Sequence, residues 1–189
     1  MATALLTIDV QQALCSGVGE VFEVARAIEN INLAAAKARA ARVLVVLIQQ
    51  ETDEGAFVYG SLGWELADGL GVEPSDISVR KRAPGSFHRT ELKELLDQHN
   101  IDQLVICGLH SDFCVDTTTR RALALGYPVV LVADGHSTVD NCVLSALQIS
   151  AHHNETLANI TSFGPRVTLV PARELQIEAG HGVAPAGSD

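Results

Sequence analysis

The sequence has few basic residues and no long apolar run. Its 13 lysines and arginines are outnumbered by 23 acidic residues, which gives a formal net charge of −10. Binding to a nucleic-acid backbone requires clustered basic side chains, so this balance argues against a nucleic-acid partner. Hydrophobic residues make up 47% of the chain, yet no run approaches the roughly 18 apolar residues of a membrane-spanning helix. We therefore expect a small-molecule partner and no membrane segment.

The chain also lacks the signs of a zinc site and of a secretory leader. Its four cysteines, Cys15, Cys107, Cys114 and Cys142, do not show the close paired spacing of zinc ligands. The N-terminus runs directly into the apolar segment 4–8, with no basic region and no small-residue cleavage site. These features predict reduced thiols and a cytoplasmic location.

What is present is a regular alternation of short apolar runs with amphipathic helical patterns, which is typical of an α/β fold with a parallel sheet. We expect a Rossmann-like, three-layer α/β/α domain over residues 1–179, with a mostly parallel sheet of about six strands. Residues 180–189 are small, polar and proline-containing, which predicts a disordered tail. The expected strands are 4–9, 43–48, 77–80, 104–108, 129–133 and 167–170. The expected helices are 20–41, 90–98, 114–126 and 140–157.

Three polar or reactive residues follow predicted strands. Asp9 ends the first strand, Lys81 follows the short strand 77–80, and Cys114 follows strand 104–108 after a turn. Ligands of open parallel sheets bind at the carboxyl ends of the strands. A carboxylate can accept the proton of a thiol, and an ammonium group favours the thiolate. This combination therefore suits nucleophilic catalysis.

Each of these residues also has a plainer interpretation. A cysteine is usually a buried core residue, as Cys107 is expected to be within its strand. Asp9 can cap a neighbouring turn, and Lys81 lies in a basic run, 80–82, that can be solvated surface. Cys114 differs because it lies at a strand-to-helix turn, where the helix dipole favours the thiolate.

Three segments carry a family resemblance. Residues 6–11 read Leu-Thr-Ile-Asp-Val-Gln, residues 81–87 read Lys-Arg-Ala-Pro-Gly-Ser-Phe, and residues 108–115 read Gly-Leu-His-Ser-Asp-Phe-Cys-Val. In this order they resemble the motifs of the isochorismatase-like cysteine hydrolases, and the resemblance extends over roughly residues 4–172. The third motif is specific, whereas Asp-x-Gln by itself is weak. Gly-Ser-Phe at 85–87 departs from the Ser-Ala-Phe or Ser-Gly-Phe of many members, but the spacing from the lysine is kept.

The resemblance implies roles for individual residues. Asp9 is the implied proton acceptor, Lys81 the electrostatic partner and Cys114 the nucleophile. It also implies a cis peptide bond between Leu109 and His110 and an oxyanion hole formed by the backbone amides of His110 and Cys114. The implied reaction is hydrolysis of a C–N bond in a small amide, lactam or carbamoyl-type substrate through a thioester. The motifs are most similar to the streptothricin hydrolase-like subgroup.

Two other functions stay open at this point. One is isochorismatase-type hydrolysis of a vinyl ether, although the thiol favours acyl transfer. The other is a catalytically silent binding or scaffold protein of the same fold, which the intact aspartate, lysine and cysteine set argues against.

The resemblance also bears on metals. Nicotinamidases of this superfamily bind a divalent cation through an Asp-x-His and further histidines after the second strand. The equivalent stretch here, 49–55, contains no histidine. His152 and His153 are adjacent on a predicted helix and so point in different directions. We therefore expect no metal and no other cofactor.

A cluster of aromatic residues supplies candidates for substrate binding. Phe57, Tyr59 and Trp64 lie within eight residues of a glycine-containing segment, in a chain whose aromatic content is 4%. Small-molecule pockets are lined by apolar and aromatic groups, so we assign these three and Phe87 to the substrate pocket. A local hydrophobic cluster or an oligomer contact are the alternatives. Because relatives usually associate, we also expect a homodimer or a higher homo-oligomer.

Overall fold

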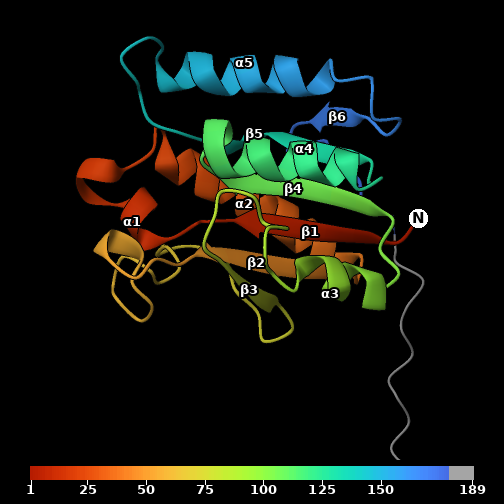
Figure 1. Cartoon of the computed structure of the whole chain (residues 1–189), viewed down its shortest axis with the longest axis horizontal. Coiled ribbons are helices and arrows are strands. Elements are labelled where there is room, and N and C mark those ends of the chain that lie inside the picture. The colour runs from red at the N-terminus through yellow and green to blue at the C-terminus, as the bar shows by residue number, and fades with distance from the viewer. Residues whose placement is uncertain (179–189) are drawn as a thin grey trace, which may run out of the picture.

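The computed structural model describes residues 1–178, which form a six-stranded sheet with helices on both faces (Figure 1). All strands are parallel, in the order β3-β2-β1-β4-β5-β6. The predicted α/β fold is therefore confirmed, while the predicted tail at 180–189 lies outside the described residues. The strands are β1 (Thr3–Ile8), β2 (Leu44–Gln50), β3 (Ile77–Lys81), β4 (Gln103–Leu109), β5 (Val129–Ser137) and β6 (Val167–Val170).

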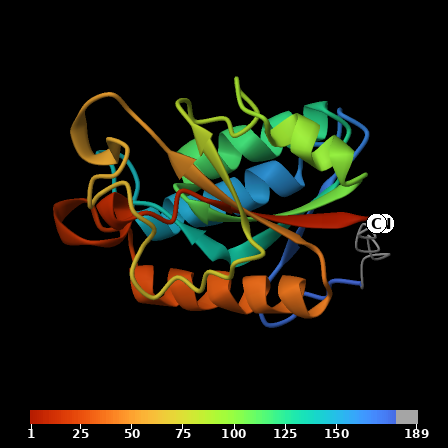
Figure 2. The same ribbon diagram turned by 90° about the horizontal axis from the view of Figure 1, so that it is seen from below.

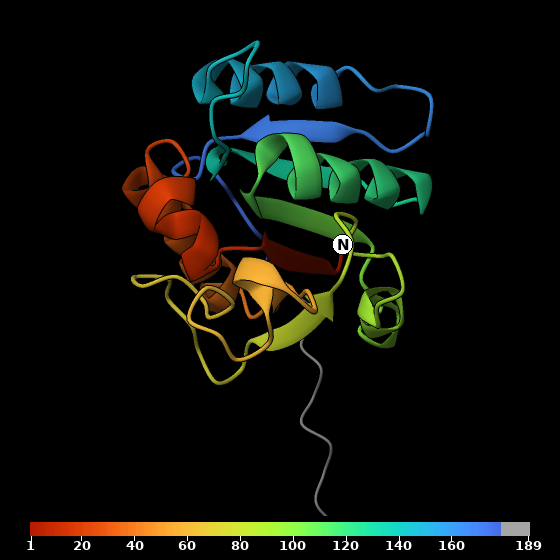
Figure 3. The same cartoon turned by 60° about the vertical axis from the view of Figure 1, so that its left-hand side comes forward.

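The strand order reverses between two central strands. From β1 the chain proceeds outward through β2 to β3, and then returns to add β4 on the other side of β1. In open α/β sheets a ligand binds where the order reverses, beyond the carboxyl ends of the strands. That edge lies on the left of Figure 1 and comes forward in Figure 3, where short helical turns and loops surround it. The fold therefore places the residues that follow β1 and β4 at the expected position of a site.

Helices cover the two faces of the sheet unequally. The helices α3 (Leu92–Gln98), α4 (Asp116–Ala124) and α5 (Ala146–Ala158) pack on one face, and α2 (Val24–Ala40) packs on the other, as Figure 2 shows. Successive side chains of a strand point to opposite faces, and both faces of β1 are buried. This explains why the strands read as continuous apolar runs instead of alternating ones.

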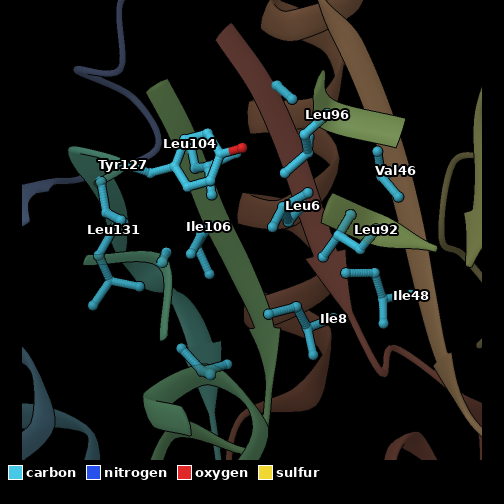
Figure 4. Packing of buried hydrophobic residues seen from close by; sticks show 14 of the residues in the cluster. Leu6, Ile8, Val46, Ile48, Leu92, Leu96, Leu104, Ile106, Tyr127 and Leu131 are labelled. Carbon is cyan, nitrogen blue, oxygen red and sulfur yellow. The ribbon is translucent and has the colours of Figure 1, made fainter. Parts of the chain in front are cut away.

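The larger core lies between the sheet and helices α3, α4 and α5. Leu6 and Ile8 of β1 pack there beside Ile106 of β4 and against Leu92 and Leu96 of α3 (Figure 4). Each such side chain contributes about 1.5–3 kcal/mol when it is fully buried. The strand ends that carry polar residues are therefore attached to well-packed elements.

Several element boundaries differ from the predicted ones. The helix expected from residue 20 begins at Val24, because Glu23 has a left-handed backbone conformation with φ 49°. The helix expected from residue 140 begins at Ala146, after Ser145 and Gln148 form a capping box. β5 continues past residue 133 to Ser137, because the strand shifts register and pairs again with β4.

Within residues 1–178, no helix is both long and apolar enough to cross a membrane.

Candidate active site

Asp9, Lys81 and Cys114 meet at the carboxyl edge of the sheet. Lys81 Nζ lies 2.6 Å from Asp9 Oδ2 and 3.3 Å from Cys114 Sγ. Its third contact is with Gln50 Oε1, at 2.8 Å. Asp9 and Lys81 are each only 1% exposed, whereas Cys114 is partly exposed. The structure thus brings together the three residues that the sequence motifs single out, and it adds Gln50, which sequence reasoning missed.

The strand ends explain how Asp9 and Lys81 reach one another. Lys81 is the last residue of β3 and pairs with Gln50, the last residue of β2. Asp9 follows β1 directly, and its amide donates to the carbonyl of Ile48 in β2. Asp9 has a φ of 51°, a conformation that is uncommon for residues other than glycine and that occurs preferentially at functional sites.

Cys114 is held in a π-helical turn, η3 (Ser111–Val115), which leads directly into α4. The predicted helix 114–126 is therefore replaced by this turn, which begins at Ser111, and by α4, which begins at Asp116. The carbonyl of His110 accepts hydrogen bonds from the amides of Phe113 and Val115. In the described backbone hydrogen bonds, this carbonyl accepts none from the Cys114 amide that lies between them. The turn thus breaks the usual helical hydrogen-bond pattern at Cys114.

The approach to this turn requires glycine. Gly108 has a φ of 127°, and an added Cβ atom would lie 2.1 Å from the carbonyl oxygen of Ile8. Only glycine tolerates both the conformation and the close approach of β1. The next peptide bond, Leu109–His110, is cis.

Buried polar side chains secure the other side of the turn. Ser111 Oγ lies 2.8 Å from Nδ1 of His136, whose Nε2 lies 2.9 Å from Asn154 Oδ1. Thr138 Oγ1 donates to Asp112 Oδ1 at 2.6 Å. Burial lowers the pKa of His136, which favours a neutral ring. The segment 134–138 resembles a family segment, and its Thr138 was expected to support this turn through a hydrogen bond, as it does. The contacts among Ser111, His136 and Asn154 were not predicted, because these residues come from η3, β5 and α5.

The pKa of Cys114 differs from the sequence-based expectation. Burial, together with the charge of Asp9, raises the pKa of the Cys114 thiol to about 12 against the opposing effect of Lys81. The direction of this shift is opposite to the one expected from the helix dipole, and desolvation is its largest cause. Burial likewise raises the pKa of Asp9, although the Lys81 ammonium opposes the shift.

The raised pKa values of Cys114 and Asp9 determine how a proton can move between the two groups. The resting thiol is protonated at neutral pH, so an attack by Cys114 requires a base. A carboxylate with a raised pKa is a stronger base than an ordinary aspartate. Asp9 Oδ1 has no hydrogen-bond partner in the part of the chain that the structure describes, and it is free to take the proton of the neighbouring thiol.

A cavity of about 310 Å³ opens at these residues. Of the four predicted substrate-binding residues, Phe57 lines it, and His110 of the predicted oxyanion hole lines it as well. The other wall residues were not singled out from the sequence for substrate binding. The lining consists of Asp9, Leu14, Gln50, Thr52, Phe57, Pro84, His110, Phe113 and Cys114.

The structure does not bring Tyr59, Trp64 or Phe87 to this cavity. The Tyr59 ring packs against Trp64 at a centroid distance of 4.7 Å, and the guanidinium of Arg80 lies 4.8 Å from the Tyr59 ring. Phe87 stacks on Tyr127 at 6.3 Å and packs against the larger core. In the single chain, these three rings therefore support loops and core packing.

The stretch that carries metal ligands in nicotinamidases has other contacts here. Gln49 Nε2 donates to the carbonyl of Trp64, and Gln50 Oε1 accepts from Lys81. Glu51 accepts from Arg80 and Arg82. Across residues 1–178, no group of three or more histidine, cysteine or acidic side chains is arranged to hold a metal ion.

Comparisons with known proteins identify the family to which the chain belongs. The model of the isochorismatase domain matches residues 3–167. Streptothricin hydrolase from Streptomyces noursei is 41% identical over 138 residues, which cover 72% of this chain and 50% of the relative. This chain thus spans about half the length of that enzyme, and 55% of a second streptothricin hydrolase from the same organism. Ureidoacrylate amidohydrolase from Pantoea ananatis is 28% identical, over 70% of this chain and 68% of its own length.

The fold agrees as well. A crystal structure described as an isochorismatase family protein has a TM-score of 0.81 and 32% sequence identity, and the match covers 89% of this chain and 97% of that one. The domain match extends over most of the sequence, and the parallel sheet is shared. This chain therefore belongs to the isochorismatase family of hydrolases.

Proposed function

We propose that this hydrolase cleaves a C–N bond in a small amide, lactam or carbamoyl-type substrate, with Cys114 as nucleophile and without a metal. The observation that carries the proposal is the position of the Lys81 ammonium, which contacts both Asp9 and Cys114 at the wall of one cavity. The names of two relatives, streptothricin hydrolase and ureidoacrylate amidohydrolase, are consistent with this reaction class.

In the acylation half-reaction, Asp9 accepts the proton of Cys114 while the sulfur attacks the substrate carbonyl carbon. Concerted transfer suits a thiol with a raised pKa, because no free thiolate has to accumulate. Lys81 offsets the negative charge that is shared between Asp9 and the sulfur. The tetrahedral intermediate then collapses, the C–N bond breaks, and the proton on Asp9 passes to the leaving amine.

In the second half-reaction, water cleaves the thioester. Asp9 accepts a proton from the water as its oxygen attacks the acyl carbon, and the C–S bond breaks. The sulfur recovers the proton from Asp9, and the carboxylic acid product leaves. Asp9 therefore acts once as a base and once as an acid in each half-reaction.

The backbone amides of His110 and Cys114 are the proposed donors to the oxyanion. Among the described residues, the amide of His110 has no backbone acceptor, and the His110 carbonyl accepts from the amides of Phe113 and Val115 but not from that of Cys114. A pre-aimed donor of this kind contributes about 3 kcal/mol to the lowering of the barrier.

A panel of amides, lactams and ureas tests the proposal through the release of ammonia or amine. We expect at least one member to be hydrolysed and to leave an acyl group on Cys114 that mass spectrometry detects after rapid quenching. Cys142→Ala, which alters an exposed cysteine, is the control and should form the same acyl-enzyme. Turnover without acylation of Cys114 would contradict the mechanism.

A further inference from the structure

We propose that the cavity at Cys114 accepts an uncharged, compact acyl group and discriminates against substrates that carry a carboxylate on that group. The inference rests on the proposed function, because it assumes that the scissile carbonyl binds at Cys114. It concerns selectivity within that reaction, and it follows from the charges that surround the cavity.

The ionisable groups in the cavity wall supply no positive charge. They are Asp9, His110 and Cys114. Burial lowers the pKa of His110, so its ring is neutral near pH 7, and burial keeps Cys114 a thiol. An incoming carboxylate therefore finds no cation in the wall with which to pair. A charge that loses its water without gaining a partner binds poorly.

Lys81 pairs with Asp9 and has no free donor for a substrate carboxylate. Its ammonium has three protons to donate, and the structure gives it three acceptors: Asp9, Gln50 and Cys114. Lys81 is 1% exposed and is not part of the cavity lining. A substrate carboxylate would have to displace one of these contacts to reach it.

The nearby arginines are engaged elsewhere. Arg80 and Arg82 both pair with Glu51, at 3.0 and 2.8 Å. With Arg89, they line a different cavity of about 390 Å³. Among the described residues, no lysine or arginine lines this cavity.

The remaining wall suits a flat, apolar acyl group. Leu14, Phe57, Pro84 and Phe113 supply apolar surface, and the volume of about 310 Å³ is at the small end of ligand pockets. Phe113 is 56% exposed, which places it where the cavity meets solvent. Benzamide has the matching character: a planar ring, no charge and one amide carbonyl.

The binding of benzamide and of 4-carboxybenzamide compares an uncharged acyl group with one that carries a carboxylate. Both are titrated against the full chain carrying Cys114→Ala, which prevents turnover, and binding is followed by saturation-transfer NMR. We expect the dissociation constant of benzamide to be at least about 10-fold lower than that of 4-carboxybenzamide. Equal binding, tighter binding of the carboxylate, or no binding of benzamide would overturn the inference.

A charge introduced into the wall provides the converse test. In the same background, Phe113→Arg should strengthen binding of 4-carboxybenzamide by at least about 10-fold, relative to benzamide. The matched control is Phe163→Arg, at a phenylalanine that is 46% exposed and does not line the cavity. It should leave both constants unchanged. An equal effect of the two arginines would overturn the inference, while Cys114-dependent hydrolysis by the wild type tests the proposed function separately.

Discussion

Lys81 Nζ lies 2.6 Å from Asp9 Oδ2, and neither residue is more than 1% exposed to solvent. A buried ion pair gains little net stability over apolar packing, because both charges lose their water. A contribution to the stability of the fold therefore does not explain why this ion pair is buried. Its contact with Cys114 gives it a chemical explanation instead.

Asp9→Asn and Lys81→Met should each lower the hydrolysis rate by at least about 10²-fold, the usual scale for a general base and its partner. Lys81→Met should also destabilise the fold by about 3–5 kcal/mol, because it leaves Asp9 buried without its cation. Denaturant unfolding and amine-release assays measure the two effects. Wild-type rates in either variant would remove that residue from the mechanism.

Labelling with iodoacetamide at pH 7 should depend on the base as well as on the thiol. We expect Cys114 to react faster than the exposed Cys142, even though its pKa is raised to about 12, because Asp9 takes the proton during attack. Asp9→Asn should remove this advantage and leave Cys142 unchanged. Cys107, fully buried with a pKa raised to about 12, should not react. Peptide mapping gives the rates, and a Cys114 rate that is insensitive to Asp9→Asn would disprove the assignment of the base.

The motifs predicted more of the site than the composition did. The parallel direction of the strands followed from their apolar runs, and the convergence of Asp9, Lys81 and Cys114 followed from the motifs. The raised pKa of Cys114 could not be predicted, because desolvation depends on packing that the sequence does not reveal. Gln50 was missed because its role depends on the pairing of β2 with β3.

Chelators should leave the activity unchanged. The side chains that would face a cation after β2 are engaged with protein partners, Gln50 with Lys81 and Glu51 with two arginines. Activity is measured after dialysis against EDTA and again after the addition of zinc, iron or manganese. Loss in EDTA that one of these ions restores would refute the metal-free mechanism.

His136 should make the stability of the fold depend on pH. Burial lowers the pKa of His136 below its ordinary value of 6.5, and Asn154, which donates to the carbonyl of Ala133, presents its oxygen to the ring. The unfolded chain therefore binds a proton that the folded state resists. The free energy of unfolding should fall as the pH drops below about 6.5.

The variant His136→Asn isolates this contribution. It should cost about 1–3 kcal/mol at pH 8, where the buried network with Ser111 is lost. The difference from wild type should shrink between pH 7 and pH 5, whereas His152→Asn, at an exposed position, should show no such trend. A constant difference across this range would rule out titration of His136.

Hydrolysis by Cys114→Ala tests the central claim most directly. The measurement compares ammonia or amine release by the wild type, Cys114→Ala and Cys142→Ala on the same amide substrate, with circular dichroism recorded for each protein. The account predicts no turnover by Cys114→Ala and full turnover by Cys142→Ala, with the same spectrum for all three. Wild-type turnover by Cys114→Ala with an unchanged spectrum would contradict it.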